Sequence, residues 1–156
     1  MSHDPGLRVV RGDGPASMDE LCDVLIPEGD EEVMFVAEKK LKWFKRQVWV
    51  VLFQIVSGDH GGAVLPMWIN VPRSDRPVRM SHTLAQVYVA ATGAKPPRDL
   101  ARRRPSSFFK DCVFLVRVRT VKRDMNHVER PEAASYSRVA YLIRRTAGTP
   151  RCLQGR

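Results

Sequence analysis

One run of ten residues constrains the fold more than any other part of this sequence. Residues 47–56 read QVWVVLFQIV, and most of them are β-branched or aromatic, the side chains that favour extended backbone. Both alternating faces of such a strand are apolar, which is typical of a strand covered on both sides. The run is also far shorter than the roughly 20 apolar residues of a membrane-spanning helix. We therefore expect a central strand of a sheet, strongly curved or buried on both faces.

Further strand signals lie on both sides of this run, and one helix follows them. Val33–Lys39 reads as the preceding strand, and Ala63–Val71 follows after a glycine-rich turn. Pro66 lies inside this third strand and has no amide hydrogen, so we expect the strand at a sheet edge or bulged there. Helical spacing then begins at Ser81, a good N-cap, and ends at Gly93, which suits a helix C-terminus.

The chain returns to strand periodicity after the helix. Cys112–Lys122 alternates apolar and charged side chains and predicts a strand. Tyr136–Arg145 predicts a last strand or a short helix, and the spacing of Val139, Leu142 and Ile143 fits a helix somewhat better. Three strands, one helix and two further strands follow the element order of the OB-fold, a five-stranded Greek-key barrel with the helix between strands 3 and 4. A small α+β sheet domain with the helix packed on one face is the alternative.

Charge is distributed unevenly along the chain. The whole chain has a net charge of +9 and a pI of about 10.0. Residues 1–32 hold nine acidic and two basic residues, for a net −7, whereas residues 33–156 hold 24 basic and eight acidic residues, for a net +16. We therefore divide the chain into an acidic, partly disordered segment (1–32), a basic OB-fold-like domain (33–146) and a frayed tail (147–156). Such asymmetry is typical of a nucleic-acid-binding domain with an acidic appendage, which we expect to fold back over the basic face.

The sequence holds no pattern that indicates catalysis or metal binding. Cys22, Cys112 and Cys152 lie far apart without a CxxC pair, which argues against a zinc site and a disulfide framework and favours reduced thiols. The His127-Val128-Glu129 triplet has no PCxxC partner, which a zinc deaminase requires. The N-terminus does not read as a signal peptide. We expect a cytoplasmic, non-enzymatic protein without a cofactor, a metal or a membrane partner.

The densest candidate site is the stretch KKLKWFKR at residues 39–46, at the tip of the first predicted hairpin. It combines cations that neutralise phosphates with two large rings that stack on unpaired bases. The loop between strands 1 and 2 is a binding loop of OB-folds. Packing of the rings into the core beside solvated cations is the alternative. The candidate residues are Lys40, Lys42, Trp43, Phe44, Lys45 and Arg46.

A second candidate group lies on the strand predicted at residues 112–122. Alternation places Arg117 and Arg119 on one face, about 7 Å apart by strand rise, which is close to the phosphate spacing of an extended strand. An ordinary solvent-facing side of a sheet is the alternative. Two arginine-rich connectors add to the same positive field: Arg73, Arg76 and Arg79, and Arg98 with Arg102–Arg104.

The sequence pattern of Val33–Thr120 as a whole resembles that of a known protein family. The pattern comprises a strand ending in Lys, Trp and Phe, the strand VWVVLFQIV, the turn SGDHGG, a strand ending at Asn70, the helix SHTLAQVYVAATG and the stretch FFKDCVFLVRVRTV. It is similar to small phage and mobile-element proteins thought to be OB-fold single-stranded DNA-binding or replication-accessory factors. The resemblance covers a little over half of the chain and implies DNA binding in replication or recombination. The extra arginines and the acidic N-terminal extension depart from that pattern.

We accordingly expect a single-stranded DNA-binding accessory protein with little sequence preference. RNA is an alternative ligand, because the contacts to the 2′-OH that distinguish RNA from DNA are not readable here. A module that docks an acidic protein partner through the same basic face is the other alternative.

Overall fold

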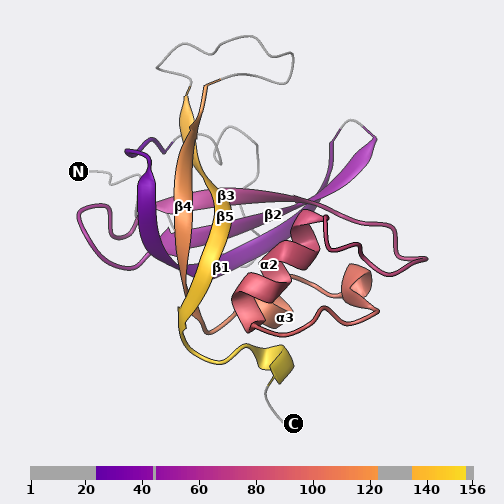
Figure 1. The fold of residues 1–156 in the computed structure, drawn as a ribbon. Coiled ribbons are helices and arrows are strands. Elements are labelled where there is room, and N and C mark those ends of the chain that lie inside the picture. Colours follow the sequence, from indigo (N-terminus) through magenta and orange to yellow (C-terminus); the bar gives the residue numbers. More distant parts are fainter. Residues whose placement is uncertain (1–23, 44, 123–134, 154–156) are drawn as a thin grey trace.

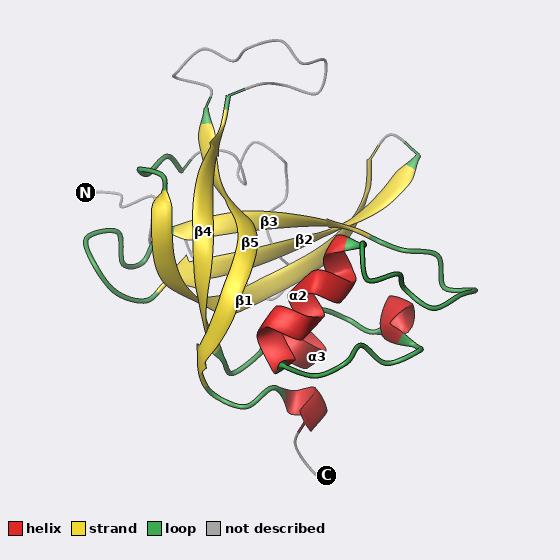
Figure 2. Ribbon diagram, in the orientation of Figure 1, coloured by secondary structure: helices red, strands yellow, loops and turns green. Residues whose placement is uncertain are grey.

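The computed structural model describes residues 24–43, 45–122 and 135–153, and a single five-stranded antiparallel sheet dominates it (Figures 1 and 2). Two short helices and two 3-10 turns accompany the sheet. The elements in chain order are β1 (Gly29–Trp43), β2 (Arg46–Ile55), β3 (Val64–Asn70), α2 (Thr83–Thr92), η2 (Leu100–Arg102), α3 (Ser106–Phe109), β4 (Val113–Val121), β5 (Tyr136–Ala147) and η4 (Arg151–Leu153).

The strands are arranged in the order β3-β2-β1-β4-β5, so β3 and β5 form the two edges. The sheet curls strongly, as Figure 1 shows, and the backbones of β3 and β5 come within 8 Å of each other (Cα–Cα). Within the described residues no hydrogen-bonded ladder joins these two strands, so the sheet is open. The prediction of a mainly β domain is confirmed, and so is the edge position of the strand that contains Pro66.

β2 is an interior strand that is buried on both faces, as its composition predicts. Val51 and Phe53 face the main core, which also holds the buried side of α2. Val50 and Leu52 face the other way and form a smaller apolar cluster with Ala37 of β1. Covering both faces removes nearly all of this strand from water, and each buried apolar side chain of this size contributes about 1.5–3 kcal/mol.

β1 is longer than the predicted strand at both ends. It begins at Gly29 rather than Val33 and ends at Trp43 rather than Lys39, with a bulge at Val36. At its C-terminal end, Leu41 packs on the smaller apolar cluster, so the lysines around it alternate to the opposite face. Because lysine is depleted in strands, the lysines here obscured the alternation of side chains that marks the end of β1 as a strand. At its N-terminal end, residues 30–32 of the acidic segment pair with β4.

β5 is a strand over its whole length, so the helical spacing that we read there was misleading. Three register shifts along the β4–β5 ladder leave Ala140, Ile143 and Thr146 without a residue of β4 opposite them in the register. Each such bulge adds one residue between core-facing positions. Val139 and Leu142 are therefore three apart and yet both face the core, which imitates the period of a helix.

α2 buries one face, which includes Leu84 and Tyr88, in the main core and lies against the two edge strands β3 and β5. Its C-terminus is at Gly93 as predicted, where a φ of 71° lies in the left-handed region that favours glycine. The N-cap is His82 rather than Ser81, because the His82 Nδ1 accepts the N–H of Leu84 at 3.0 Å.

The segment that reads as a plain basic connector also contains the turn η2 and the helix α3. Phe108 and Phe109 of α3 are fully buried in the core. Phe109 packs edge to face on Phe53, Phe114 and Phe108, and Phe108 packs in the same way on Tyr88 of α2. Because proline and arginine surround Phe108 and Phe109, the sequence pattern does not indicate that they are buried. Among the described residues, no helix is long and apolar enough to cross a membrane.

The His82 cap predicts a pH-dependent stability. Partial burial lowers the pKa of His82 below its ordinary 6.5, and only the neutral ring accepts the Leu84 N–H. The unfolded chain therefore binds the proton more readily, so the cap contributes fully above pH 6.5 and is lost as the pH falls below it. We expect His82→Ala to lower the free energy of unfolding by about 1 kcal/mol at pH 8, with a smaller difference at pH 5.

Urea denaturation at the two pH values measures this difference. His82→Asn is the matched control, because an asparagine caps helices without titrating near neutral pH. It should keep the stability at pH 8 and reduce its loss at pH 5. An equal effect of His82→Ala at both pH values would contradict the role of the neutral ring.

Candidate functional site

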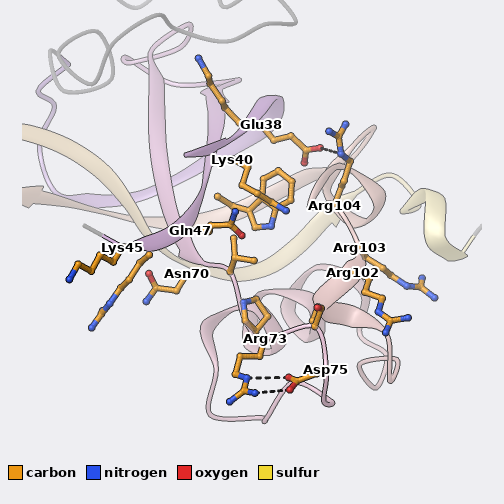
Figure 3. A pocket seen from close by; sticks show the side chains of 17 residues that line it. Glu38, Lys40, Lys45, Gln47, Asn70, Arg73, Asp75, Arg102, Arg103 and Arg104 are labelled. Atoms are coloured by element: carbon orange, nitrogen blue, oxygen red, sulfur yellow. Dashed lines mark hydrogen bonds and ion pairs between the residues drawn. The ribbon is translucent and has the colours of Figure 1, made fainter. Parts of the chain in front are cut away.

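An open groove of about 1210 Å³ lies beside the part of the β1–β2 hairpin that extends beyond the core (Figure 3). Segments that are distant in sequence line it: the end of the hairpin, the loop after β3, and the residues from η2 to Arg104. Two lining side chains, Glu38 and Asp75, are acidic. Eight are cationic: Lys39, Lys40, Lys45, Arg46, Arg73, Arg102, Arg103 and Arg104.

The hairpin side of the groove continues the core-facing surface of the sheet. Val51 and Trp49 of β2 both face the main core, and their partners on β1 are Glu38 and Lys40. The Lys40 Nζ lies 4.9 Å from the centroid of the Trp49 ring, a cation–π contact. Past Trp49 this face carries the polar Gln47 instead of an apolar residue. The core face of the hairpin thus becomes a charged surface as the strands leave the core.

The opposite side of the groove is formed by Arg102, Arg103 and Arg104. Leu100 fixes the start of this segment, because it is fully buried in the core. The Glu38 carboxylate lies between the two sides: it accepts the N–H of Ser106 at 2.7 Å, and the Arg104 Nε is 3.8 Å from it. Figure 3 shows Glu38 and Arg104 next to each other, joined by a dashed line. β1 is therefore in direct contact with the segment that carries Arg102–Arg104.

The loop after β3 supplies the third part of the lining. Arg73 donates two hydrogen bonds to Asp75, at 3.1 and 2.6 Å. These bonds hold the pKa of Asp75 below its ordinary value. Both acidic side chains of the groove are thus already engaged by arginine or by Ser106.

Several cations remain available to a ligand. Lys45, Arg46 and Arg102 make no ion pair with any carboxylate in the part of the chain that the structure describes. Lys45 also has a φ of 66°, in the left-handed region, at the turn between β1 and β2. A side chain other than glycine is uncommon there. The groove therefore presents positive charge that nothing in the described protein neutralises.

The structure brings part of the predicted site together. Lys40, Lys45 and Arg46 line the groove, while Lys42 lies exposed on the same hairpin without being part of the lining. The side chain of Trp43 and all of Phe44 lie outside the described residues. The two arginine-rich connectors, whose position beside the hairpin no local pattern predicts, contribute Arg73 and Arg102–Arg104. Sequence reasoning missed Glu38, Gln47, Trp49 and Asn70, which also line the groove.

Arg117 and Arg119 are not part of this groove. Arg117 is opposite Asp30 at the other end of β1 and donates a hydrogen bond to it at 3.2 Å. Asp30 and Trp43 are 13 positions apart, up to about 40 Å along a strand. Arg119 lies 5.7 Å from the ring centroid of Tyr141 on β5. The two predicted groups are therefore at opposite ends of the sheet.

The described part of the acidic segment lies along β4. Besides the Asp30–Arg117 pair, Glu28 accepts the backbone N–H of Thr120 at 3.0 Å. We expected the acidic segment to cover the basic face; its described residues contact β4, where Asp30 pairs with Arg117, and do not line the groove. The acidic residues before position 24 lie outside the described residues.

Comparison with protein-family models, with curated proteins and with solved structures finds no match to this chain. Within the described residues, no group of three or more His, Cys, Asp or Glu side chains is placed to hold a metal ion. The geometry and charge of the groove are therefore the basis for a functional proposal.

The contact between Lys40 and Trp49 predicts a measurable effect on the groove. Lys40→Ala removes the cation that lies over the ring, so we expect a loss of about 0.5–1 kcal/mol in the free energy of unfolding and easier access of acrylamide to Trp49. Fluorescence quenching measures that access after Trp43 and Trp68 are replaced by phenylalanine, which leaves Trp49 as the single tryptophan of the three in the chain.

Lys42→Ala is the matched control, because Lys42 is an exposed lysine two positions along the same strand. It should leave the quenching of Trp49 unchanged. Equal quenching in the two variants would show that Lys40 does not shield the ring.

Proposed function

We propose that this chain binds a single-stranded nucleic acid, with DNA as the favoured ligand, in the groove between the β1–β2 hairpin and Arg102–Arg104. The observation that carries the proposal is the charge of the groove: eight cationic side chains line it, and its two acidic side chains are already engaged within the protein. The binding is non-catalytic and needs no cofactor.

A polyanion suits this groove better than a single small anion. The cations come from three segments and line an extended, open space rather than converging on one point (Figure 3). A nucleic acid offers a row of phosphates to such a surface, and each neutralised phosphate releases bound counterions, which favours association. Contacts to phosphate carry no sequence information. Little sequence preference is therefore part of the proposal.

The fold supports a single strand as the ligand. A ladder between β3 and β5 would close the observed strand order into a five-stranded barrel, and the OB-fold is a barrel of this kind that is partly open. We propose an OB-type barrel on this basis. In OB-folds the loop between the first two strands binds oligonucleotides, and here that turn contains Lys45 of the groove.

The biological setting follows from the ligand and from the sequence resemblance. Single-stranded DNA is exposed during replication and recombination, and residues 33–120 resemble phage and mobile-element factors of these processes. We propose an accessory role in the cytoplasm on these grounds. RNA and an acidic protein are the competing ligands, and the experiment below includes both.

The test is a titration of a labelled thymidine oligonucleotide of about 16 nucleotides, the upper end of the site size of an OB-fold, at several salt concentrations. We expect affinity to fall steeply as salt rises. Lys45→Ala, Arg46→Ala and Arg102→Ala should each weaken binding and each reduce the slope of log affinity against log salt by about 0.7, the value for one phosphate contact on a single strand.

Arg117→Ala is the matched control. It removes one positive charge at the other end of β1, beyond the screening length of about 8–10 Å near physiological salt, and should leave both quantities nearly unchanged. Duplex of the same length should bind more weakly. Binding that ignores salt, or equal losses in Arg117→Ala and Arg102→Ala, would reject the groove. Tighter binding of uridine oligonucleotides would assign the site to RNA, and binding of an acidic protein alone would assign it to that partner.

A further inference from the structure

Glu38 is an unusual residue for a groove that attracts a polyanion. Its side chain is only 8% exposed, although it lies among eight cations that line the same space. Its oxygens accept the Ser106 N–H at 2.7 Å and the Ser106 Oγ–H at 3.0 Å, and the Arg104 Nε is 3.8 Å away. Hydrogen bonds to an ionised group are among the strong ones in proteins.

These contacts join two parts of the chain that are separated by 68 residues. We call residues 100–107 the arginine arch, because they carry Arg102–Arg104 between two attachments to the core. One attachment is the buried Leu100, and the other is Phe108 of α3, which is also fully buried. Glu38 contacts the arch between these attachments, at Arg104 and Ser106.

We propose that Glu38 is a positioning residue, which holds the arginine arch against the β1–β2 hairpin so that Arg102–Arg104 form one side of the binding groove. This inference rests on the proposed binding of a single strand. The carboxylate does not touch the ligand; it repels phosphate at long range and acts through the cations that it orders. The net effect on binding is favourable, because the single negative charge of Glu38 holds the three positive charges of Arg102–Arg104 in position.

Electrostatics alone and positioning predict opposite signs, which makes the proposal testable. If Glu38 contributed only its charge, its removal would make the groove more positive and would strengthen binding to a polyanion. If Glu38 positions the arch, its removal frees the arch and weakens binding despite the gain in positive charge.

The first experiment measures oligonucleotide affinity and its salt slope for Glu38→Ala, Glu38→Gln and Asp75→Asn. We expect Glu38→Ala to bind roughly tenfold more weakly, the loss of one charge-assisted contact, and to lower the salt slope by about 0.7 or more as arch cations disengage. Glu38→Gln keeps an acceptor for Ser106 without the charge, so it should restore most of the affinity.

Asp75→Asn is the control for charge. Asp75 is the other acid of the groove, is exposed, and contacts only its own loop in the described residues. Its replacement frees Arg73 and should strengthen binding. Strengthened binding in both Glu38→Ala and Asp75→Asn would overturn the positioning role, and so would weakened binding with an unchanged salt slope.

The second experiment does not depend on nucleic acid. Amide hydrogen exchange of the free protein should become faster at residues 102–107 in Glu38→Ala, while the amides of β2 keep their protection and show that the fold is intact. Unchanged exchange in the arch would overturn the proposal. If the wild-type protein binds no oligonucleotide, the proposed function fails and the positioning role in binding fails with it, while the exchange result still decides whether Glu38 anchors the arch.

Discussion

The fold depends on the need to cover both faces of β2. A strand that is apolar on both faces is stable only when each face is removed from water, and here two different sets of residues do this. The core-facing side packs against α2, α3 and the β4–β5 pair, and the other side packs with Ala37 of β1. Because β1 must follow β2 along its length, the hairpin extends beyond the core, and this extension forms one side of the groove.

The same alternation that builds the core also places the charges. Every second residue of β1 faces the core side, so the positions after Val33 and Phe35 on that face are Glu38 and Lys40 once the bulge at Val36 has passed. Lysine is rarely fully buried, so the apolar surface of β1 gives way to charged side chains at these residues. A cationic surface next to a packed core is therefore a direct result of a period of two that continues into a basic sequence.

Most of the strands could be predicted from the sequence, because period-two patterns and glycine-rich turns are local signals. β5 was ambiguous because its bulges space Val139 and Leu142 like helical residues, and a bulge depends on the partner strand. The burial of Phe109 depends on contacts with β2 and β4, and that of Phe108 on a contact with α2, and no local pattern records either. The candidate site was only partly predictable for the same reason: the cations of the hairpin could be identified by their density, but their proximity to Arg73 and Arg102–Arg104 is set by the path of the chain around α2.

The distribution of acidic residues distinguishes the two predicted basic groups. On β4, Arg117 is paired with Asp30 and the backbone of Thr120 is bonded to Glu28, so acidic side chains already engage part of this face. In the groove, Glu38 and Asp75 are outnumbered by cations and are bound to arginine or Ser106. Net charge of the whole chain cannot distinguish these two surfaces. The difference lies in which strand the acidic segment pairs with, because β1 brings Asp30 beside β4, while the groove at the far end of the hairpin holds only Glu38 and Asp75 among its described acidic side chains.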